Sequence, residues 1–293
     1  MTAESEILPH IIQRITGTPT TTYRIANLGG GCINQALKLC FGDQTYFIKL
    51  AQTGNLEMFE SEAAGLEALA AAGVIRTPGV ICVGMTETHT YLVLEHLPLK
   101  NTGDQALAGR QLAALHRTTN RRYGWNRDNT IGATPQPNEP CDSWIDFWRE
   151  RRLGFQLTLA AQQGYQGLLQ ERGARLQEKL PGLLDHCPAA SLLHGDLWSG
   201  NLGYDGNGEP VIYDPAVYYG DREADLAMTE LFGGFSSRFY RAYNEAWPLD
   251  SDYQIRKTLY NLYHILNHLN LFGGHYEQQA LAMTDRLLAE LGG

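Results

Sequence analysis

The strand-like segments of this 293-residue chain are confined to its first third, and this asymmetry limits the folds that it can adopt. A strand-like run over 21–28 is followed by three glycines, a second run over 33–41, the tight-turn pair Gly42-Asp43 and a third run over 45–50. Short connections between consecutive strands predict antiparallel pairing, because parallel strands need a long crossover. We therefore expect an antiparallel sheet at the start of the chain.

A helix and two more strands extend this first region. Apolar residues recur at three- and four-residue steps over 55–72, as in an amphipathic helix, and strand-like runs cover 80–85 and 90–94. Helical periodicity dominates afterwards. The predicted helices of the whole chain are 3–15, 55–72, 104–118, 142–162, 165–180, 223–245, 252–270 and 275–291. We predict a bilobal α+β fold: a small N-terminal lobe, residues 1–97, with a five-stranded antiparallel sheet plus helix, and a larger, mainly helical C-terminal lobe, residues 98–293.

Composition argues against several classes of function. The net charge of −9 disfavours a nucleic-acid or anionic-membrane partner. No window approaches the ~20 uninterrupted apolar residues of a membrane span, and the N-terminal residues lack the pattern of a signal peptide. The five cysteines are well separated and form no Cys-x-x-Cys pair, which favours reduced thiols. We expect a cytoplasmic protein, a monomer or homodimer, that acts on a small-molecule or protein-linked substrate.

The strongest functional signal is the stretch His194–Asn201, which reads His-x-Asp-x-x-x-x-Asn and is followed by Asp214 after an apolar run. Phosphoryl transfer from ATP uses one carboxylate to orient the acceptor hydroxyl, and an amide oxygen plus a second carboxylate to hold Mg²⁺. Asp196 is the predicted catalytic base, and Asn201 and Asp214 are the predicted metal ligands. We expect His194 to support the loop by hydrogen bonding rather than to react.

Upstream residues complete a candidate ATP site. The glycines Gly29, Gly30 and Gly31 could let backbone amides approach phosphates, although an ordinary hairpin turn is the alternative. Lys49 ends an apolar strand, where it either points into solvent or binds the α- and β-phosphates and pairs with a glutamate of the next helix. We favour Glu62 as this partner, with Glu60 as the second choice.

The segment Glu95-His96-Leu97 follows an apolar strand at the predicted connection between the lobes. Backbone groups of Glu95 and Leu97 are therefore predicted to hydrogen-bond the adenine ring. The side chains of this segment do not indicate which backbone groups do so.

Two side chains beside these motifs have alternative interpretations. Trp198, two residues from Asp196, is either a core anchor or a flat platform for the apolar face of a sugar. Cys32, next to the glycines, is either an inert small side chain or a redox-sensitive thiol near bound phosphates.

Three residues further along the chain are expected to be structural. Asp225 opens a predicted helix, and we expect it to hydrogen-bond the backbone of the stretch around Asp196. His264 and His268 have the four-residue spacing of helical metal ligands, but their apolar neighbours favour a packed helix.

The order of these parts resembles the protein-kinase-like phosphotransferases, which include the aminoglycoside phosphotransferases, and most closely the fructosamine/ketosamine kinases. The segments that carry the resemblance are 29–34, 58–63, 128–138, 144–153, 194–201 and 214–223. It implies ATP and Mg²⁺ as cofactors and phosphorylation of the sugar 3-hydroxyl of ketosamines, which are fructosamine, ribulosamine or erythrulosamine adducts. It also implies deglycation, because a 3-phosphoketosamine is unstable and releases its amine.

Two alternatives to a ketosamine kinase stay open at this point. A kinase of the same fold could act on another hydroxyl substrate, such as an aminoglycoside or an amino alcohol. Such cationic substrates need acidic clusters or aromatic cages, whereas the distinctive segment 144–153 carries Arg149, Arg151 and Arg152. The chain could also be a nucleotide-binding scaffold without turnover.

Overall fold

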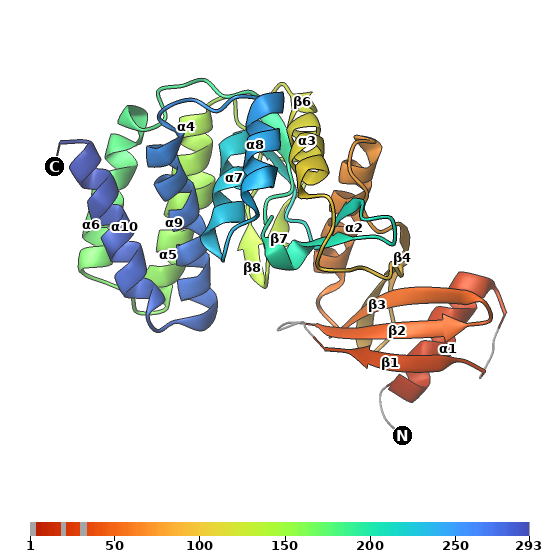
Figure 1. Ribbon diagram of the computed structural model, residues 1–293. Coiled ribbons are helices and arrows are strands. Elements are labelled where there is room, and N and C mark those ends of the chain that lie inside the picture. Colours follow the sequence, from red (N-terminus) through yellow and green to blue (C-terminus); the bar gives the residue numbers. More distant parts are fainter. Residues whose placement is uncertain (1–3, 19–21, 30–33, 293) are drawn as a thin grey trace.

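A five-stranded antiparallel sheet forms the N-terminal lobe, as the sequence predicted. The computed structural model describes residues 4–18, 22–29 and 34–292. The strands lie in the order β1-β2-β3-β5-β4 (Figure 1). Their bounds are β1 Arg24–Leu28, β2 Gln35–Phe41, β3 Gln44–Gln52, β4 Val80–Met85 and β5 His89–Glu95.

Helices α1 (Glu4–Thr16) and α2 (Leu56–Ala71) pack against the sheet with separate apolar clusters. The α1 cluster includes Ile48 and Leu50 of β3, and the α2 cluster includes Leu92 and Leu94 of β5. Because successive side chains of a strand point to opposite faces, Lys49 is directed to the face opposite α1. This alternation places the lysine where α2 and the C-terminal lobe can reach it.

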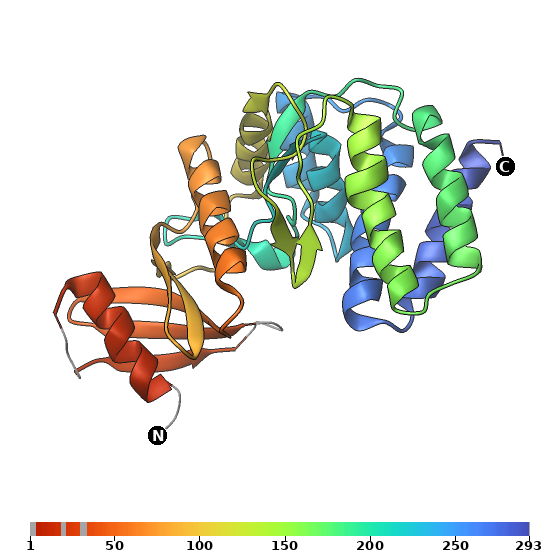
Figure 2. The same cartoon turned by 180° about the vertical axis from the view of Figure 1, so that it is seen from behind.

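The C-terminal lobe is mainly helical, and it lies on the other side of α2 from the sheet (Figures 1 and 2). Its helices are α3 Gln105–His116, α4 Trp144–Phe147, α5 Phe155–Gln162, α6 Leu168–Lys179, α7 Arg222–Leu231, α8 Ser237–Ala246, α9 Tyr253–Phe272 and α10 Tyr276–Glu290. Short strands join them: β6 Thr119–Asn120, β7 Asn129–Ile131, β8 Thr134–Gln136, β9 Ala190–Leu193, β10 Leu202–Tyr204, β11 Pro210–Ile212 and β12 Tyr218–Gly220. The boundary after residue 97 falls between β5 and α3 and stays a prediction.

Two helix predictions were wrong in detail. The expected single helix over 223–245 is two helices, α7 and α8, because Gly233 and Gly234 adopt positive φ angles of 92° and 71°. The expected α-helix over 142–162 contains a π-helix at Trp148–Gly154, between α4 and α5. Apolar periodicity does not distinguish i→i+4 from i→i+5 bonding over so few residues.

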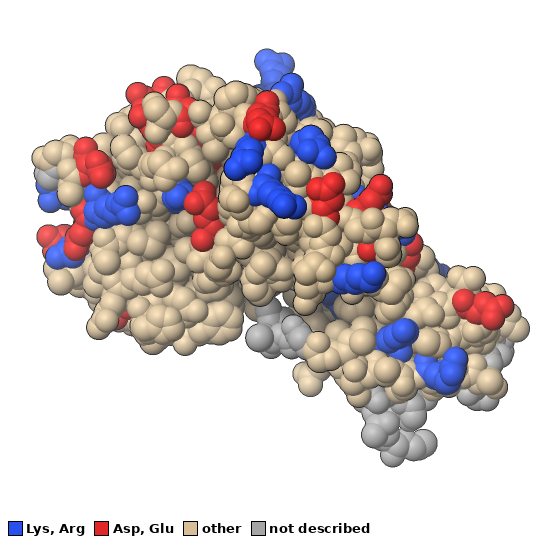
Figure 3. All heavy atoms as spheres, in the orientation of Figure 1, with Lys and Arg blue, Asp and Glu red and all other residues tan. Residues whose placement is uncertain are grey.

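The surface carries both signs of charge. Figure 3 shows basic and acidic side chains over both lobes on the face it presents. No helix among the described residues is long and apolar enough to cross a membrane. Of the cysteines, Cys40, Cys82, Cys141 and Cys187 are free thiols.

Candidate active site

The loop after β9 is held by Asp225 of α7. One carboxylate oxygen of Asp225 accepts the backbone N–H of His194 at 2.7 Å, and the other accepts that of Gly195 at 2.8 Å. His116 of α3 lies 3.2 Å from the same carboxylate. Burial alone would raise the pKa of Asp225. The hydrogen bond and the charge of His116 have the larger effect, so the pKa of Asp225 is lowered. The sequence-based expectation that Asp225 supports this loop is confirmed.

Only glycine fits at position 195. Its φ is 84°, and a Cβ there would lie 2.0 Å from the carbonyl oxygen of Ala216. This close approach brings the loop that carries Asp196 against the segment that follows Asp214. The two candidate carboxylates therefore belong to one packed unit.

His194 is a structural residue of this unit, as expected. Its side chain is buried, and its Nε2 lies 3.0 Å from the carbonyl oxygen of Tyr213. Nε2 therefore carries the proton, and Nδ1 accepts the backbone N–H of Asp196 at 3.3 Å. Burial lowers the pKa of His194, so the ring is neutral and bridges the segments around Asp196 and Asp214.

Asp196 has the properties of a catalytic base. Burial, followed by repulsion from Asp214 and Asp225, raises the pKa of Asp196 to about 7. The amide nitrogen of Asn201 donates to the backbone oxygen of Asp196 at 2.8 Å and to its carboxylate at 3.3 Å. A base with a pKa near the working pH is well matched to proton transfer.

Lys49 joins both lobes at this point. Its ammonium lies 2.7 Å from Glu62 of α2 and 2.7 Å from Asp214. Glu62, rather than Glu60, is thus the partner of Lys49, as the sequence favoured. Glu60 instead lies 3.6 Å from Arg127.

The carboxylate of Asp214 is available to a ligand. Its side chain is 45% exposed. Its backbone has a φ of 56°, an uncommon conformation for a residue with a side chain. Asp214 supplies carboxylate oxygens, and Asn201 uses its amide nitrogen on Asp196, which leaves its amide oxygen for a cation. Oxygen donors of this kind suit Mg²⁺.

Several predicted nucleotide contacts have a definite place in the fold. Gly29 directly follows β1, whereas Gly30, Gly31 and Cys32 lie outside the described residues. The backbone N–H of Glu95 donates to Gly79 at 2.7 Å, and its side chain pairs with Arg76 at 2.9 Å. An adenine contact at Glu95 is therefore left to its backbone carbonyl, and Leu97 lies two residues further along the connection.

Trp198 begins a row of aromatic rings that the sequence did not reveal. Its side chain is 37% exposed, so it is not a core anchor, and it lies edge-to-face with Phe232 at a centroid distance of 6.3 Å. Phe232 stacks on His268 of α9 at 4.7 Å. Burial lowers the pKa of His268 and lowers that of His264 to about 3, so both rings are neutral.

The arginines of segment 144–153 do not form a free cationic surface, which removes one argument against a cationic substrate. Arg152 is fully buried. Arg149 lies 2.6 Å from Asp146, and Arg151 lies 2.5 Å from Glu139. Asp146 and Arg149 are three residues apart in sequence, whereas the partner of Arg151 lies in the loop before α4 and could not be predicted from the sequence.

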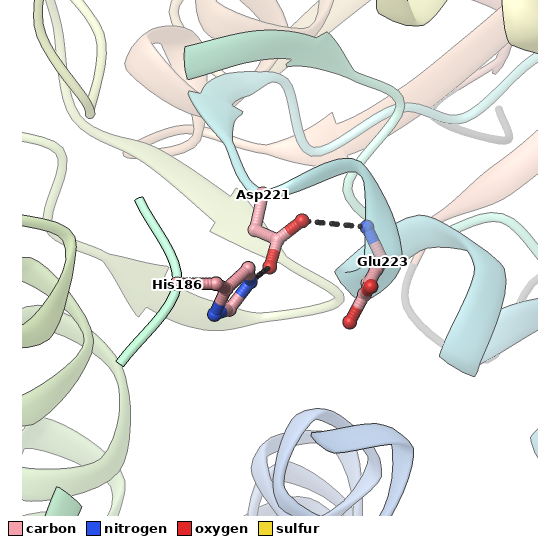
Figure 4. A group of neighbouring side chains, drawn as sticks. All are labelled: His186, Asp221 and Glu223. Atoms are coloured by element: carbon pink, nitrogen blue, oxygen red, sulfur yellow. Dashed lines mark hydrogen bonds and ion pairs between the residues drawn. The ribbon is translucent and has the colours of Figure 1, made fainter. Parts of the chain in front are cut away.

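His186, Asp221 and Glu223 form a separate cluster with metal-ligand chemistry (Figure 4). Asp221 accepts hydrogen bonds from the His186 ring at 2.7 Å, from the Tyr260 hydroxyl at 2.5 Å and from the Glu223 backbone at 3.0 Å. Arg256 binds both carboxylate oxygens of Glu223, at 2.7 and 3.0 Å. Since all four carboxylate oxygens are engaged, this cluster ties the start of α7 to α9.

Comparison with known proteins shows the family to which the chain is similar. The family model for fructosamine kinase matches residues 5–290. A Synechocystis protein that carries the name ketoamine kinase is 50% identical over 280 residues, with 94% of each chain covered. The chloroplastic protein-ribulosamine 3-kinase of Arabidopsis thaliana is 41% identical, covering 94% of this chain and 86% of its own.

Solved structures show the same likeness. A Haemophilus somnus structure that carries the name fructosamine-3-kinase superposes with a TM-score of 0.87, at 28% identity and with 96% of each chain covered. An aminoglycoside phosphotransferase, at a TM-score of 0.65 and 16% identity over 98% of this chain and 99% of its own, shares the fold alone. The protein-kinase-like fold expected from the sequence is confirmed, and the chain belongs to the fructosamine kinase family.

Proposed function

We propose that this chain transfers the γ-phosphoryl group of ATP to the 3-hydroxyl of a ketosamine. The proposal rests on the proximity of three charged side chains from separate segments of both lobes. Lys49 contacts Asp214, and Asp214 is close enough to Asp196 to raise its pKa. That arrangement supplies a cation for phosphates, a base for a hydroxyl and a carboxylate for a metal. Membership of the fructosamine kinase family supports the choice of acceptor.

In this reaction Asp196 accepts the proton of the sugar hydroxyl. The hydroxyl oxygen then forms a bond to the γ-phosphorus, the bond from that phosphorus to the bridging oxygen breaks, and ADP leaves with the electron pair. Because transfer depends on alignment more than on covalent chemistry, the main contribution of the protein is to fix Asp196 beside the acceptor. Asp225 and Asn201 do so by holding the backbone on either side of it.

Asp214 and Asn201 would hold Mg²⁺, which neutralises the charge that develops on the phosphates. Lys49 would bind the α- and β-phosphates while Glu62 keeps its side chain in place. The 2.7 Å contact between Lys49 and Asp214 supports this assignment, because it brings the phosphate-binding and metal-binding groups together.

Trp198 is proposed to receive the apolar face of the sugar. An exposed indole two residues from the base suits such stacking, and the name of the Arabidopsis relative supports a ribulosamine as one substrate. Phosphorylation at the 3-hydroxyl would make the adduct unstable, so that the amine is released. This outcome would make the protein a deglycation enzyme.

A panel of acceptors tests the proposal. The protein is incubated with ATP, Mg²⁺ and either a ribulosamine, a fructosamine, an aminoglycoside or an amino alcohol, and new phosphate esters are identified by ³¹P NMR. We expect an ester with at least one ketosamine and none with the other acceptors. An ester only with an aminoglycoside or amino alcohol would contradict the proposed acceptor. If no acceptor gives an ester or a released amine, the proposed kinase activity is contradicted.

A further inference from the structure

Segments 128–138 and 144–153 distinguish this chain in sequence, yet they contribute none of the residues assigned above to catalysis. Four of their polar side chains are instead buried. Asn129, Gln136, Asn138 and Arg152 are 7%, 1%, 0% and 0% exposed. Buried polar groups are retained only with hydrogen-bond partners, so those partners indicate what the segments do.

Two of these side chains bind the backbone just after Asp214. The amide nitrogen of Asn129 donates to the carbonyl of Val217 at 2.8 Å, and that of Gln136 donates to the carbonyl of Ala216 at 3.1 Å. Gln136 also donates to the amide oxygen of Asn129 at 2.8 Å, which links the two. The carbonyls of consecutive residues are thus held by one pair of amides.

The peptide they hold also contacts the loop of the catalytic base. The N–H of Ala216 donates to the carbonyl of His194 at 2.8 Å, while its carbonyl packs against Gly195. A shift of this peptide would therefore move the metal-binding segment relative to the segment of Asp196. The amides of Asn129 and Gln136 oppose such a shift.

The side chains of Asn129 and Gln136 are themselves held by further hydrogen bonds. The hydroxyl of Tyr263, on α9, donates to the amide oxygen of Gln136 at 2.7 Å. Arg152 donates to the amide oxygen of Asn138 at 2.7 Å, and Asn138 donates in turn to Asn129 at 2.8 Å. Both anchors lie on helical segments: Tyr263 on α9 and Arg152 on the π-helix at Trp148–Gly154.

Burying the charge of Arg152 costs free energy, and this cost supports a role in positioning the groups that it contacts. No carboxylate of the described residues pairs with it; carbonyl oxygens and the rings of Phe147 and Tyr218, at 4.6 and 4.0 Å, surround it. A cation buried without an acidic partner loses hydration that these contacts only partly replace. The π-helix that carries Arg152 is a feature found frequently at functional sites.

Asp214 needs such support. Its positive φ is unfavourable for a residue with a side chain and persists only where neighbouring contacts fix the backbone. We propose that Asn129 and Gln136 are positioning residues, which hold the peptide 216–217 so that Asp214 presents its carboxylate to the metal of bound nucleotide. The proposal rests on the kinase reaction proposed above, but its test does not require turnover.

The test compares two glutamine variants. Gln136→Met keeps the length of the side chain and removes its hydrogen bonds. Gln170→Met is the control, because the amide of the part-buried Gln170, on α6, donates to the backbone carbonyls of Leu157 and Tyr165 instead of the peptide. The affinity for Mn²⁺ is measured by electron paramagnetic resonance in the presence of a non-hydrolysable ATP analogue, and nucleotide affinity is measured without metal.

We expect Gln136→Met to bind Mn²⁺ about tenfold more weakly, with metal-free nucleotide affinity unchanged, and Gln170→Met to match the parent. If Gln136→Met does not fold, Tyr263→Phe replaces it, with an expected two- to threefold loss. The proposal would be overturned if Gln136→Met binds Mn²⁺ within twofold of the parent, or if both glutamine variants lose the same affinity. Where Tyr263→Phe replaces Gln136→Met, parental Mn²⁺ affinity in Tyr263→Phe would overturn it. If the parent phosphorylates no ketosamine but the Mn²⁺ result holds, only the proposed function fails.

Discussion

The ammonium of Lys49 lies 2.7 Å from the carboxylate of Asp214, although 165 positions separate the two residues in sequence. Burial alone would lower the pKa of Lys49, but Asp214 and Glu62 raise it above its usual range, so the lysine is charged at any working pH. This contact links the N-terminal sheet to the segment of the C-terminal lobe that is proposed to bind the metal. The proposed arrangement of phosphate-binding and metal-binding groups depends on this contact.

Lys49→Met should reduce kcat/KM for ATP by 10²-fold or more, because it removes the charge that binds the phosphates. Glu62→Gln should have a smaller effect, since its amide oxygen still accepts a hydrogen bond from the lysine. Steady-state kinetics with varied ATP measure both. Glu60→Gln is the control, because Glu60 lies beside Arg127 rather than Lys49, and an equal loss in Glu60→Gln would contradict the pairing.

The rate should depend on the protonation of Asp196. With a pKa of about 7, the base is protonated and inactive at lower pH, so kcat/KM for the ketosamine should fall about tenfold per unit below pH 7. A bound cation favours the carboxylate, so the midpoint of this profile should move to lower pH as the concentration of Mg²⁺ and ATP is raised. A profile that is flat from pH 5.5 to 8 would contradict the role of Asp196.

Asp196→Asn should stabilise the protein at pH 8. The raised pKa means that the folded state holds a proton that the unfolded state releases between about pH 4 and 7. Stability from this group is therefore present below pH 4, falls through that window and stays lost above it. Removing the charge should raise the free energy of unfolding by about 2 kcal/mol at pH 8, a value reduced for partial solvent exposure.

Urea denaturation at pH 8 and at pH 4 measures the effect on stability. The difference between Asp196→Asn and the parent should disappear at pH 4, where the parent carboxyl is mostly protonated in the folded state. Asp185→Asn, at an exposed position, is the control and should change little at either pH. A destabilised Asp196→Asn at pH 8 would contradict the burial argument.

Trp198→Ala should raise KM for the ketosamine about tenfold, because it removes the proposed stacking surface, and leave KM for ATP unchanged. Trp198→Phe should recover most of the affinity. Leu168→Ala removes an exposed apolar side chain of α6 and serves as the control. The same KM for ketosamine in Trp198→Ala and the parent would exclude the indole from the acceptor site.

Local sequence patterns predicted the sheet, most helices and the pairing of Lys49 with Glu62. Glu62 could be chosen over Glu60 because it opens the apolar face of α2, and that face determines which side chains turn toward the sheet. The break at Gly233 and Gly234 was missed because apolar periodicity continues on both sides of it.

The buried contacts of Gln136 and Arg152 could not be predicted from the sequence. Polar residues in a proline-rich loop and next to other arginines normally indicate a solvated surface. Their burial depends on the π-helix and on α9, which approach the loop only in the folded chain. The row of aromatic rings from Trp198 through Phe232 to His268 could not be predicted either, because its three residues come from separate segments of the chain.

The most direct test of the account is ³¹P NMR of a ribulosamine incubated with ATP and Mg²⁺, using the parent protein and Asp196→Asn side by side. The parent should form one new phosphate monoester on the 3-hydroxyl, and the ADP released should equal the sum of this ester and the inorganic phosphate that its breakdown yields. Asp196→Asn should remain folded and lose 10²- to 10⁴-fold in rate, the usual contribution of a general base. Turnover by Asp196→Asn at the parental rate, or ATP consumption by the parent with neither a sugar phosphate nor a released amine, would contradict the account.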